Sequence, residues 1–149
     1  MAISRGSGTE IIRSAFFEDI DSTDTVLIFG EQHHIYTVLS IIIRCRVYDA
    51  NTTPFQLDLR GYDAKAGTSA QSIELFSPSP IAGETFVIND KFSFNGHEPT
   101  DFAGPMDDVA KQNAIADQGS SVPQKLMLSS GDANDEYEVS ITYIDQNNA

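Results

Sequence analysis

The 149-residue sequence predicts an all-β protein, an antiparallel β-sandwich of jelly-roll type with an N-terminal arm and one long loop. From Thr25 onward, apolar side chains recur at every second position, which is the period of a strand that buries one face. Turn-rich segments separate these runs, and no run is followed by a convincing amphipathic helix, which disfavours an α/β fold. About eight one-sided strands bury their apolar faces best as two packed sheets, as in a jelly roll.

The expected strands in chain order are Val26–Phe29, Ile35–Val47, Phe55–Arg60, Ser72–Phe76, Glu84–Asn89, Lys91–Asn95, Gln124–Leu128 and Tyr137–Tyr143. The second and longest of these is apolar at nearly all its odd positions, so its odd-numbered side chains are expected to face the core. The third alternates most cleanly, with Phe55, Leu57 and Leu59 predicted inside. The last strand repeats that pattern.

The chain before the first of these strands has a different character. Met1–Gly8 is polar and glycine-bearing, and apolar anchors then follow at intervals of four or five residues. Chain ends are ordered only where something holds them, so this segment is interpreted either as an arm that contacts a partner or as a short helix packed on the domain. We predict an arm over residues 1–23 and a sandwich domain over residues 24–149. The residues expected to bind a partner are Arg5, Ile11, Ile12, Arg13, Phe16 and Phe17.

A second irregular segment, Gly96–Pro123, contains prolines, glycines and five acidic side chains with little alternation. Within it, Asp107–Ala116 is compatible with about two helical turns, since Asp107 and Asp108 are favourable near a helix N-terminus. Long loops on rigid sandwiches are commonly functional. A plain crossover between the two sheets is the alternative.

Charge and composition exclude several classes of function. The chain carries 22 acidic against 9 basic side chains, a net charge of -13, so nucleic acid is not an expected partner and a neutral or basic protein surface is. The longest strongly apolar stretch, Val38–Ile43, is too short to span a bilayer, and Met1–Gly8 has no apolar secretory region. A single cysteine, Cys45, rules out an internal disulfide framework.

No catalytic or metal-binding pattern is found. The acidic clusters at Glu18–Asp24 and Asp132–Glu136 lack the spacing of a calcium loop. The adjacent pair His33 and His34 would point to opposite faces of a strand, and Cys45 lies in a core-facing phase. No nucleophile-elbow, phosphate-loop or zinc spacing occurs. We therefore expect no enzyme activity, no catalytic residue, no metal and no cofactor.

The sequence favours a role in protein assembly over an enzymatic role. Arg44, Arg46 and Arg60 occupy the outer phases of two strands that are predicted to be neighbours, where they would pair with acidic groups of a second copy. The strand Ile35–Tyr48 also carries Val38 and Ile42 on its other side. Such a two-sided strand needs a cover, which is either a local segment or a neighbouring subunit.

Three segments resemble small virion proteins of tailed bacteriophages. They are Ser4–Ser14 (SRGSGTEIIRS), Gln32–Ser40 (QHHIYTVLS) and Asn89–Gly96 (NDKFSFNG). Within that group, the size and the all-β pattern are most similar to capsid cement, or decoration, proteins. The resemblance implies a sandwich that sits on the outside of the head as a homotrimer, binds the major capsid protein and has no catalytic residues.

The expected function is therefore to stabilise a capsid by bridging its subunits, without enzymatic chemistry. The expected location is the capsid surface of the virion, after synthesis in the host cytoplasm, with no nucleic-acid or membrane partner. Deletion of residues 1–17 is expected to abolish particle binding and leave the β domain folded. Two alternatives stay open: a tail or connector component, and a receptor- or glycan-binding module. The second would use tyrosines, with Tyr36, Tyr48 and Tyr62 as candidates, and the Gly96–Pro123 loop as its site.

Overall fold

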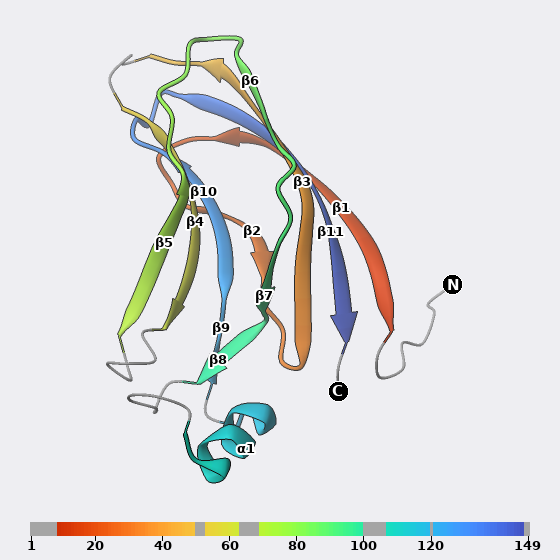
Figure 1. The fold of residues 1–149 in the computed structure, drawn as a ribbon. Helices are drawn as coiled ribbons and strands as arrows, with labels where there is room; N and C mark the ends of the chain where they lie inside the picture. The colour runs from red at the N-terminus through yellow and green to blue at the C-terminus, as the bar shows by residue number, and fades with distance from the viewer. Residues whose placement is uncertain (1–8, 50–52, 63–68, 100–106, 120, 148–149) are drawn as a thin grey trace.

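The computed structural model describes residues 9–49, 53–62, 69–99, 107–119 and 121–147. Within these ranges the chain forms an all-β sandwich with one short helix (Figure 1). The elements are β1 (Glu10–Ile20), β2 (Thr25–Phe29), β3 (His34–Val47), β4 (Phe55–Tyr62), β5 (Ala70–Phe76), β6 (Thr85–Ile88), β7 (Phe92–Asn95), β8 (His97–Pro99), α1 (Val109–Asp117), β9 (Ser121–Pro123), β10 (Lys125–Ser130) and β11 (Glu136–Asn147). The predicted fold class is confirmed.

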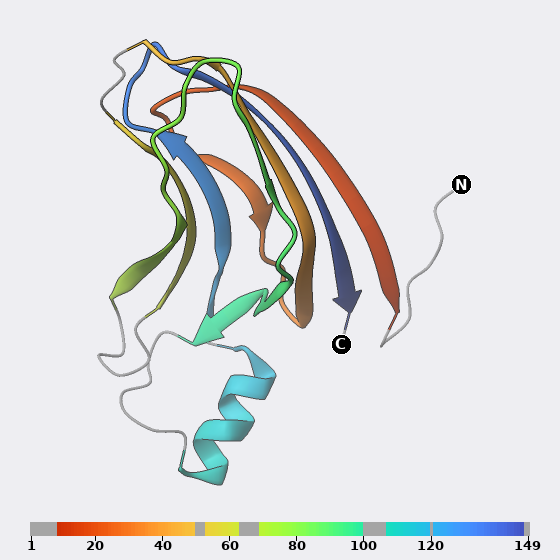
Figure 2. The same ribbon diagram turned by 45° about the horizontal axis from the view of Figure 1, so that its top comes forward.

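The strand order is that of a jelly roll. One sheet, sheet A, has the order β1-β11-β3-β6, and β7 also pairs with β3; the other, sheet B, has the order β2-β10-β4-β5. The antiparallel pairs β1/β11, β2/β10, β3/β6 and β4/β5 are those of one long hairpin. Rolling that hairpin up adds the pairs β11/β3 and β10/β4, and it places β1 and β3 in sheet A but β2 and β4 in sheet B. The short pair β8/β9 and α1 lie beyond one end of the sandwich (Figures 1 and 2).

The core lies between the two sheets. Phe55 and Leu57 of β4 are fully buried, whereas Gln56 and Arg60 are exposed, as their alternation predicts. Phe55 packs edge-on against Phe76 and Phe86, and its ring is 5.1 Å from that of Tyr137. Aromatic pairs at these separations add about 0.5–1.5 kcal/mol each beyond their buried area.

Strand β3 changes phase halfway along its length, which the sequence analysis did not predict. Ile41, Ile43 and Cys45 face the core as expected, but in the first half the buried residues are the even-numbered His34, Tyr36 and Val38. The pairing with β11 shifts between Thr142 and Tyr143, so that Leu39 is an extra residue on β3. A β-bulge of this kind inverts the inward and outward sets on either side of it. The odd-position prediction is therefore wrong before the bulge.

The predicted division into an arm over residues 1–23 and a sandwich over residues 24–149 also needs correction. Residues 10–20 are neither an arm nor a helix: they form β1, the edge strand of sheet A, paired with β11 from Glu10 to Ile20. Its inward set includes Arg13 and Ala15, and its outward set includes Ile12 and Phe16, so no period of two is visible in the sequence. Residues 1–8 lie outside the described ranges.

Helix α1 matches the predicted two turns within the long loop. Asp108 caps its N-terminus by accepting a hydrogen bond from the backbone N–H of Ala110 at 2.7 Å. Gln118 ends it in the left-handed conformation, at φ 53°, and donates its backbone N–H to Ala114 O and Ile115 O. The Gln118 side chain then accepts from the His33 backbone N–H at 2.6 Å, which ties the helix to the β2–β3 turn.

Three backbone segments meet at Gly30 and Gly96, beside the start of β3. Gly30 donates to Gln124 O at 2.9 Å, and Gly96 donates to His34 O at 2.7 Å. A methyl group at position 30 would overlap the Gly96 carbonyl and lie 2.8 Å from Gln124 O, and both obstacles are backbone atoms.

Gly30→Ala is therefore expected to destabilise the fold by about 1–3 kcal/mol, the usual cost of overpacking. Urea unfolding measures the loss. Gly119→Ala is the matched control, because a methyl group at position 119 meets no atom within 4 Å. Equal stability of the two variants would contradict the close approach of the three segments.

Candidate functional site

An apolar row crosses the outer face of sheet A. Phe16 on β1 pairs with Ser140 on β11, Ser140 pairs with Ile42 on β3, and Ile42 pairs with Val87 on β6. Since paired residues share a face, these side chains form one line across four strands. Phe16 is 64% exposed, Ile42 43% and Val87 63%. Ile12, four residues before Phe16 on β1, is 71% exposed on the same face.

Side chains around the row shape a shallow hollow. It measures about 160 Å³ and is lined by Phe16, Ile42, Arg44, Thr85, Glu138, Val139 and Ser140. The row supplies its apolar side, while an ion pair between Arg44 and Glu138, 3.9 Å apart, supplies a polar rim. An apolar centre with a polar rim is the composition of a protein-binding surface. We call the row and this rim the sheet A outer face.

The structure divides the six predicted arm residues among different environments. Ile12 and Phe16 are exposed on the sheet A outer face. Ile11 and Phe17 point inward and are half-buried, and Phe17 packs against the core cluster. Arg13 is exposed but forms a salt bridge with the buried Asp145, and Arg5 lies outside the described residues. The expected effect of deleting residues 1–17 changes accordingly, because that deletion would remove most of β1 from the sheet.

The three arginines expected at an oligomer contact do not lie together. Arg44 and Arg46 are on β3 in sheet A, and Arg60 is on β4 in sheet B, so the prediction that their strands are neighbours is wrong. Each also has partners within the chain. Arg46 lies 3.5 Å from Glu138, and Arg60 lies 3.9 Å from Asp24. Because these arginines are already paired within the chain, their positions do not single them out as contacts to a second copy.

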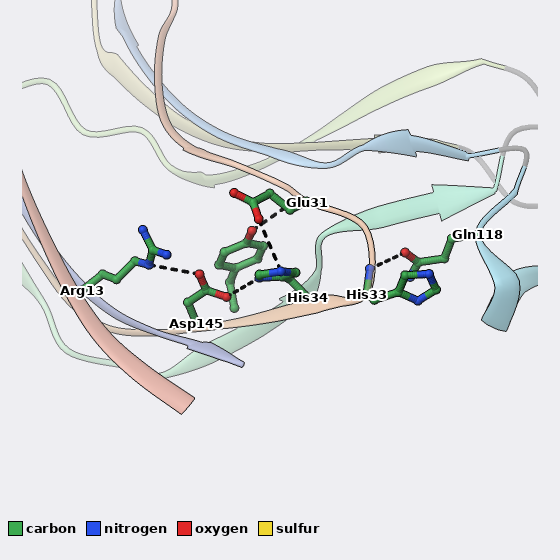
Figure 3. Close-up of polar contacts among 7 residues, drawn as sticks. Arg13, Glu31, His33, His34, Gln118 and Asp145 are labelled. Atoms are coloured by element: carbon green, nitrogen blue, oxygen red, sulfur yellow. Dashed lines mark hydrogen bonds and ion pairs between the residues drawn. The ribbon is translucent and has the colours of Figure 1, made fainter. Parts of the chain in front are cut away.

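A buried polar cluster lies where β1, β3 and β11 meet, at the end of the sandwich nearest α1 (Figure 3). Its centre is Asp145, which is 2% exposed. Asp145 Oδ2 lies 3.0 Å from Arg13 Nε, and its Oδ1 lies 2.6 Å from His34 Nδ1. The other imidazole nitrogen, Nε2, lies 3.3 Å from Glu31 Oε2. The Glu31 backbone N–H donates to the Tyr36 hydroxyl at 3.1 Å. No sequence pattern indicated this cluster, because Arg13 and Asp145 lie far along the chain from Glu31, His34 and Tyr36.

The cluster forms a clasp between parts of the fold that lie far apart along the chain. Both imidazole nitrogens of His34 lie near carboxylate oxygens, Nδ1 at 2.6 Å from Asp145 Oδ1 and Nε2 at 3.3 Å from Glu31 Oε2. The contacts join the edge strand β1 to the β2–β3 turn and to β11. We assign it a structural role.

Burial gives three tyrosines raised pKa values. Loss of solvent raises the pKa of Tyr36 to about 12 and also raises the pKa of Tyr137 and of Tyr143. Above pH 10, the ordinary tyrosine pKa, the unfolded chain releases phenolic protons that the folded chain retains. The folded state then binds more protons, so its stability falls as pH rises.

We therefore expect the free energy of unfolding to decline steeply from pH 10 to pH 12, with these buried tyrosines ionising only as the protein unfolds. Urea unfolding at several alkaline pH values, read together with the ultraviolet absorbance of tyrosinate, measures both. Tyr36→Phe should reduce the slope. A flat stability profile over this range would refute the account.

The other residues that the sequence analysis singled out have structural positions. Cys45 is fully buried, which raises the pKa of its thiol, in agreement with its predicted core position. Tyr36 and Tyr48 are buried too, so the predicted stacking surface of three tyrosines does not form. In the Asp132–Glu136 turn, Asp132 accepts from Asn134 N, and Asp135 accepts from Asp49 N and Ser130 Oγ. Over the described ranges, no group of three or more His, Cys, Asp or Glu side chains is arranged to hold a metal ion.

The sequence analysis identified part of the sheet A outer face. Phe16 and Ile12 were singled out, though as parts of an arm, and Ile42 was noted as the second apolar side of its strand. Val87 was missed because it lies between Phe86 and Ile88, which face the core side. A run of three apolar residues in a four-residue strand was the available signal for a second apolar face.

No protein-family model and no curated protein matches the sequence. A chain in a solved structure of Bacillus endospore appendages, described as a novel family of disulfide-linked pili, is similar at 12% identity. The match covers 100% of this chain and 97% of that chain, with a TM-score of 0.39. So distant a likeness carries no argument about function. The jelly-roll assignment rests on the strand order alone. In the part of the chain that the structure describes, no helix has the length and apolar character to cross a membrane.

Proposed function

We propose that this chain is a non-enzymatic structural protein of a tailed-phage virion that binds the outside of the capsid and bridges its subunits as a cement protein. The observation that carries the proposal is the row Phe16, Ile42 and Val87 on the sheet A outer face. The resemblance of three sequence segments to small virion proteins gives the proposal its setting.

Exposed apolar side chains in one contiguous row favour contact with another protein. Covering them releases about 25 cal/mol for each Å² of apolar surface removed from water. Their strands are held rigidly by the sandwich, so little conformational entropy is lost when they dock. If several copies bridge neighbouring subunits, each contact raises the effective concentration of the next, and weak single contacts suffice.

The charge supports a protein partner rather than packaged DNA. A net charge of -13 repels phosphate and keeps the free protein soluble before assembly. It also favours a neutral or basic docking surface, which we propose is on the major capsid protein. The proposed homotrimer would not be held by Arg44, Arg46 and Arg60 as one patch, because β3 and β4 lie in different sheets.

The copy number in purified particles of the phage that encodes the chain tests the proposal. Calibrated mass spectrometry should find the protein at a fixed ratio to the major capsid protein, as a lattice-wide cement requires. A number far below that of the capsid protein would assign it to the tail or connector instead. Absence from the particle would overturn the virion proposal altogether.

A further inference from the structure

An apolar groove opens along one side of the sandwich, where sheets A and B both end. It has a volume of about 420 Å³. Its walls come from β4 and β5 on one side and from β6, β7 and the segment between them on the other. The lining is mainly apolar and consists of Leu57, Leu75, Phe76, Phe86, Val87, Ile88, Asn89, Asp90, Lys91 and Phe92. Leu57, at 1% exposed, shows that the groove reaches the core.

The strands on either side of this groove are free edges. Among the described residues β5 pairs only with β4, and β6 and β7 pair only with β3. Ala70–Leu75 of β5 is exposed at every position and contains no proline or lysine, the usual protections of an edge strand. β6 likewise has none. Both edges therefore present unpaired backbone groups beside an apolar groove.

The direction of the β6 amides follows from its pairing. The Cys45 N–H donates to Glu84 O at 2.9 Å, so the Cys45 amide points toward β6. Amides alternate in direction along an antiparallel strand, and the register is continuous from Arg44/Thr85 to Ile41/Ile88. Val87, which pairs with Ile42, therefore turns its N–H away from β3 and outward from the edge.

Val87 also links the groove to the sheet A outer face. It lines the groove and is the last member of the apolar row. A strand added to β6 would send alternate side chains to opposite faces of the sheet. One set would fill the groove beside Phe86 and Ile88, and the other would continue the row beyond Val87.

We infer that the groove and the β6 edge together accept an extended segment of a neutral or basic partner protein, which pairs with β6 as an additional strand of sheet A. This inference rests on the proposed function, because it specifies how the same partner engages sheet A. One observation favours this occupant over a second copy. Each copy carries a charge of -13, so two copies repel each other, whereas a neutral or basic segment is not repelled. Strand addition of this kind gains affinity from main-chain hydrogen bonds and specificity from alternate side chains.

The test uses the full-length protein, wild type and two variants. Val87→Pro removes the outward amide, a change that edge strands tolerate. Val87→Ala is the matched control, since it loses the side chain but retains the amide. The probes are phage particles that lack the protein and a synthetic peptide, Lys-Val-Thr-Val-Thr-Val-Lys. Hydrogen exchange of the β6 amides and binding affinity are read out for each probe, and thermal melting checks that the variants fold.

Either probe is expected to protect the β6 amides of the wild type, and Val87→Pro should bind at least about tenfold more weakly than Val87→Ala. A peptide with glutamate in place of lysine should bind more weakly at low salt. Particle binding without protection of β6, and with equal affinity of the two variants, would overturn strand addition but leave the proposed function intact. Peptide binding with protection of β6, but no particle binding, would overturn the proposed function and support the groove. If Val87→Pro fails to fold, the inference is tested by hydrogen exchange of the wild-type protein alone. If neither probe protects the wild-type β6 amides, the inference is refuted.

Discussion

Replacing Phe16 and Ile42 together by threonine is expected to weaken binding to capsids by about a thousandfold. Both side chains belong to the apolar row of the sheet A outer face, Phe16 on β1 and Ile42 on β3, with β11 between them. Truncating a buried side chain at the centre of an interface typically costs about 2 kcal/mol or more, which is roughly thirtyfold in affinity. If the two residues act independently, their free-energy losses add, which gives the expected thousandfold reduction in affinity.

The double variant should fold normally, because threonine suits a strand and both positions are exposed in the free protein. Phe29→Thr is the matched control. Phe29 is 57% exposed, much as Phe16 is, but it lies on sheet B, where it pairs with Lys125. Co-sedimentation with particles that lack the protein measures affinity for all three proteins. Undiminished binding of the double variant, or an equal loss in Phe29→Thr, would refute docking through sheet A.

The fold was predictable from the sequence because most core strands carry their orientation in their own residues. Phe55–Arg60 buries its apolar set and exposes its polar set, so a period of two identified both the strand and its inward face. Helix α1 was found from its acidic N-terminus for a similar local reason. Strand order is a different matter, since it depends on which strands pair across long stretches of chain.

The failures trace to bulges and to the edge of the sheet. Leu39 is an extra residue on β3, and one such residue reverses every inward position before it. On β1, the inward position of Arg13 is occupied by a charge whose partner, Asp145, lies far along the chain. A period-two rule cannot recognise a charged residue as inward without knowing that partner. The strand was therefore interpreted as an arm.

The candidate site was only partly predictable for a related reason. Phe16, Ile42 and Val87 come from three strands, and each by itself is an isolated exposed apolar residue of the kind that every protein has. Their significance comes from the register that aligns them. The three arginines show the converse. Their two strands, β3 and β4, are consecutive in the sequence and look adjacent, but this fold places β3 in sheet A and β4 in sheet B.

Asp145→Ala is expected to destabilise the fold by about 3–5 kcal/mol, the usual cost of removing one partner from a buried ion pair. Most of this loss of stability comes from His34. Its side chain is 10% exposed and would lose the carboxylate that lies 2.6 Å from its Nδ1. Arg13 contributes less, because its side chain is 45% exposed and water screens its charge. Asp145→Asn should lose less than Asp145→Ala, since the amide oxygen still accepts one hydrogen bond.

Urea unfolding of the variants measures these losses, and hydrogen exchange locates them. Because the clasp joins β1 to β11 and to the β2–β3 turn, exchange in Asp145→Ala should accelerate more in β1 than in β10, which lies in sheet B. Glu138→Ala is the control: it breaks the pairs with two exposed arginines, Arg44 at 3.9 Å and Arg46 at 3.5 Å, and should cost no more than about 1 kcal/mol. A loss in Asp145→Ala no greater than in this control would mean that packing of β1, rather than the clasp, holds the edge strand in place. Faster exchange throughout the molecule, with no preference for β1, would mean that the clasp stabilises the sandwich as a whole rather than its edge.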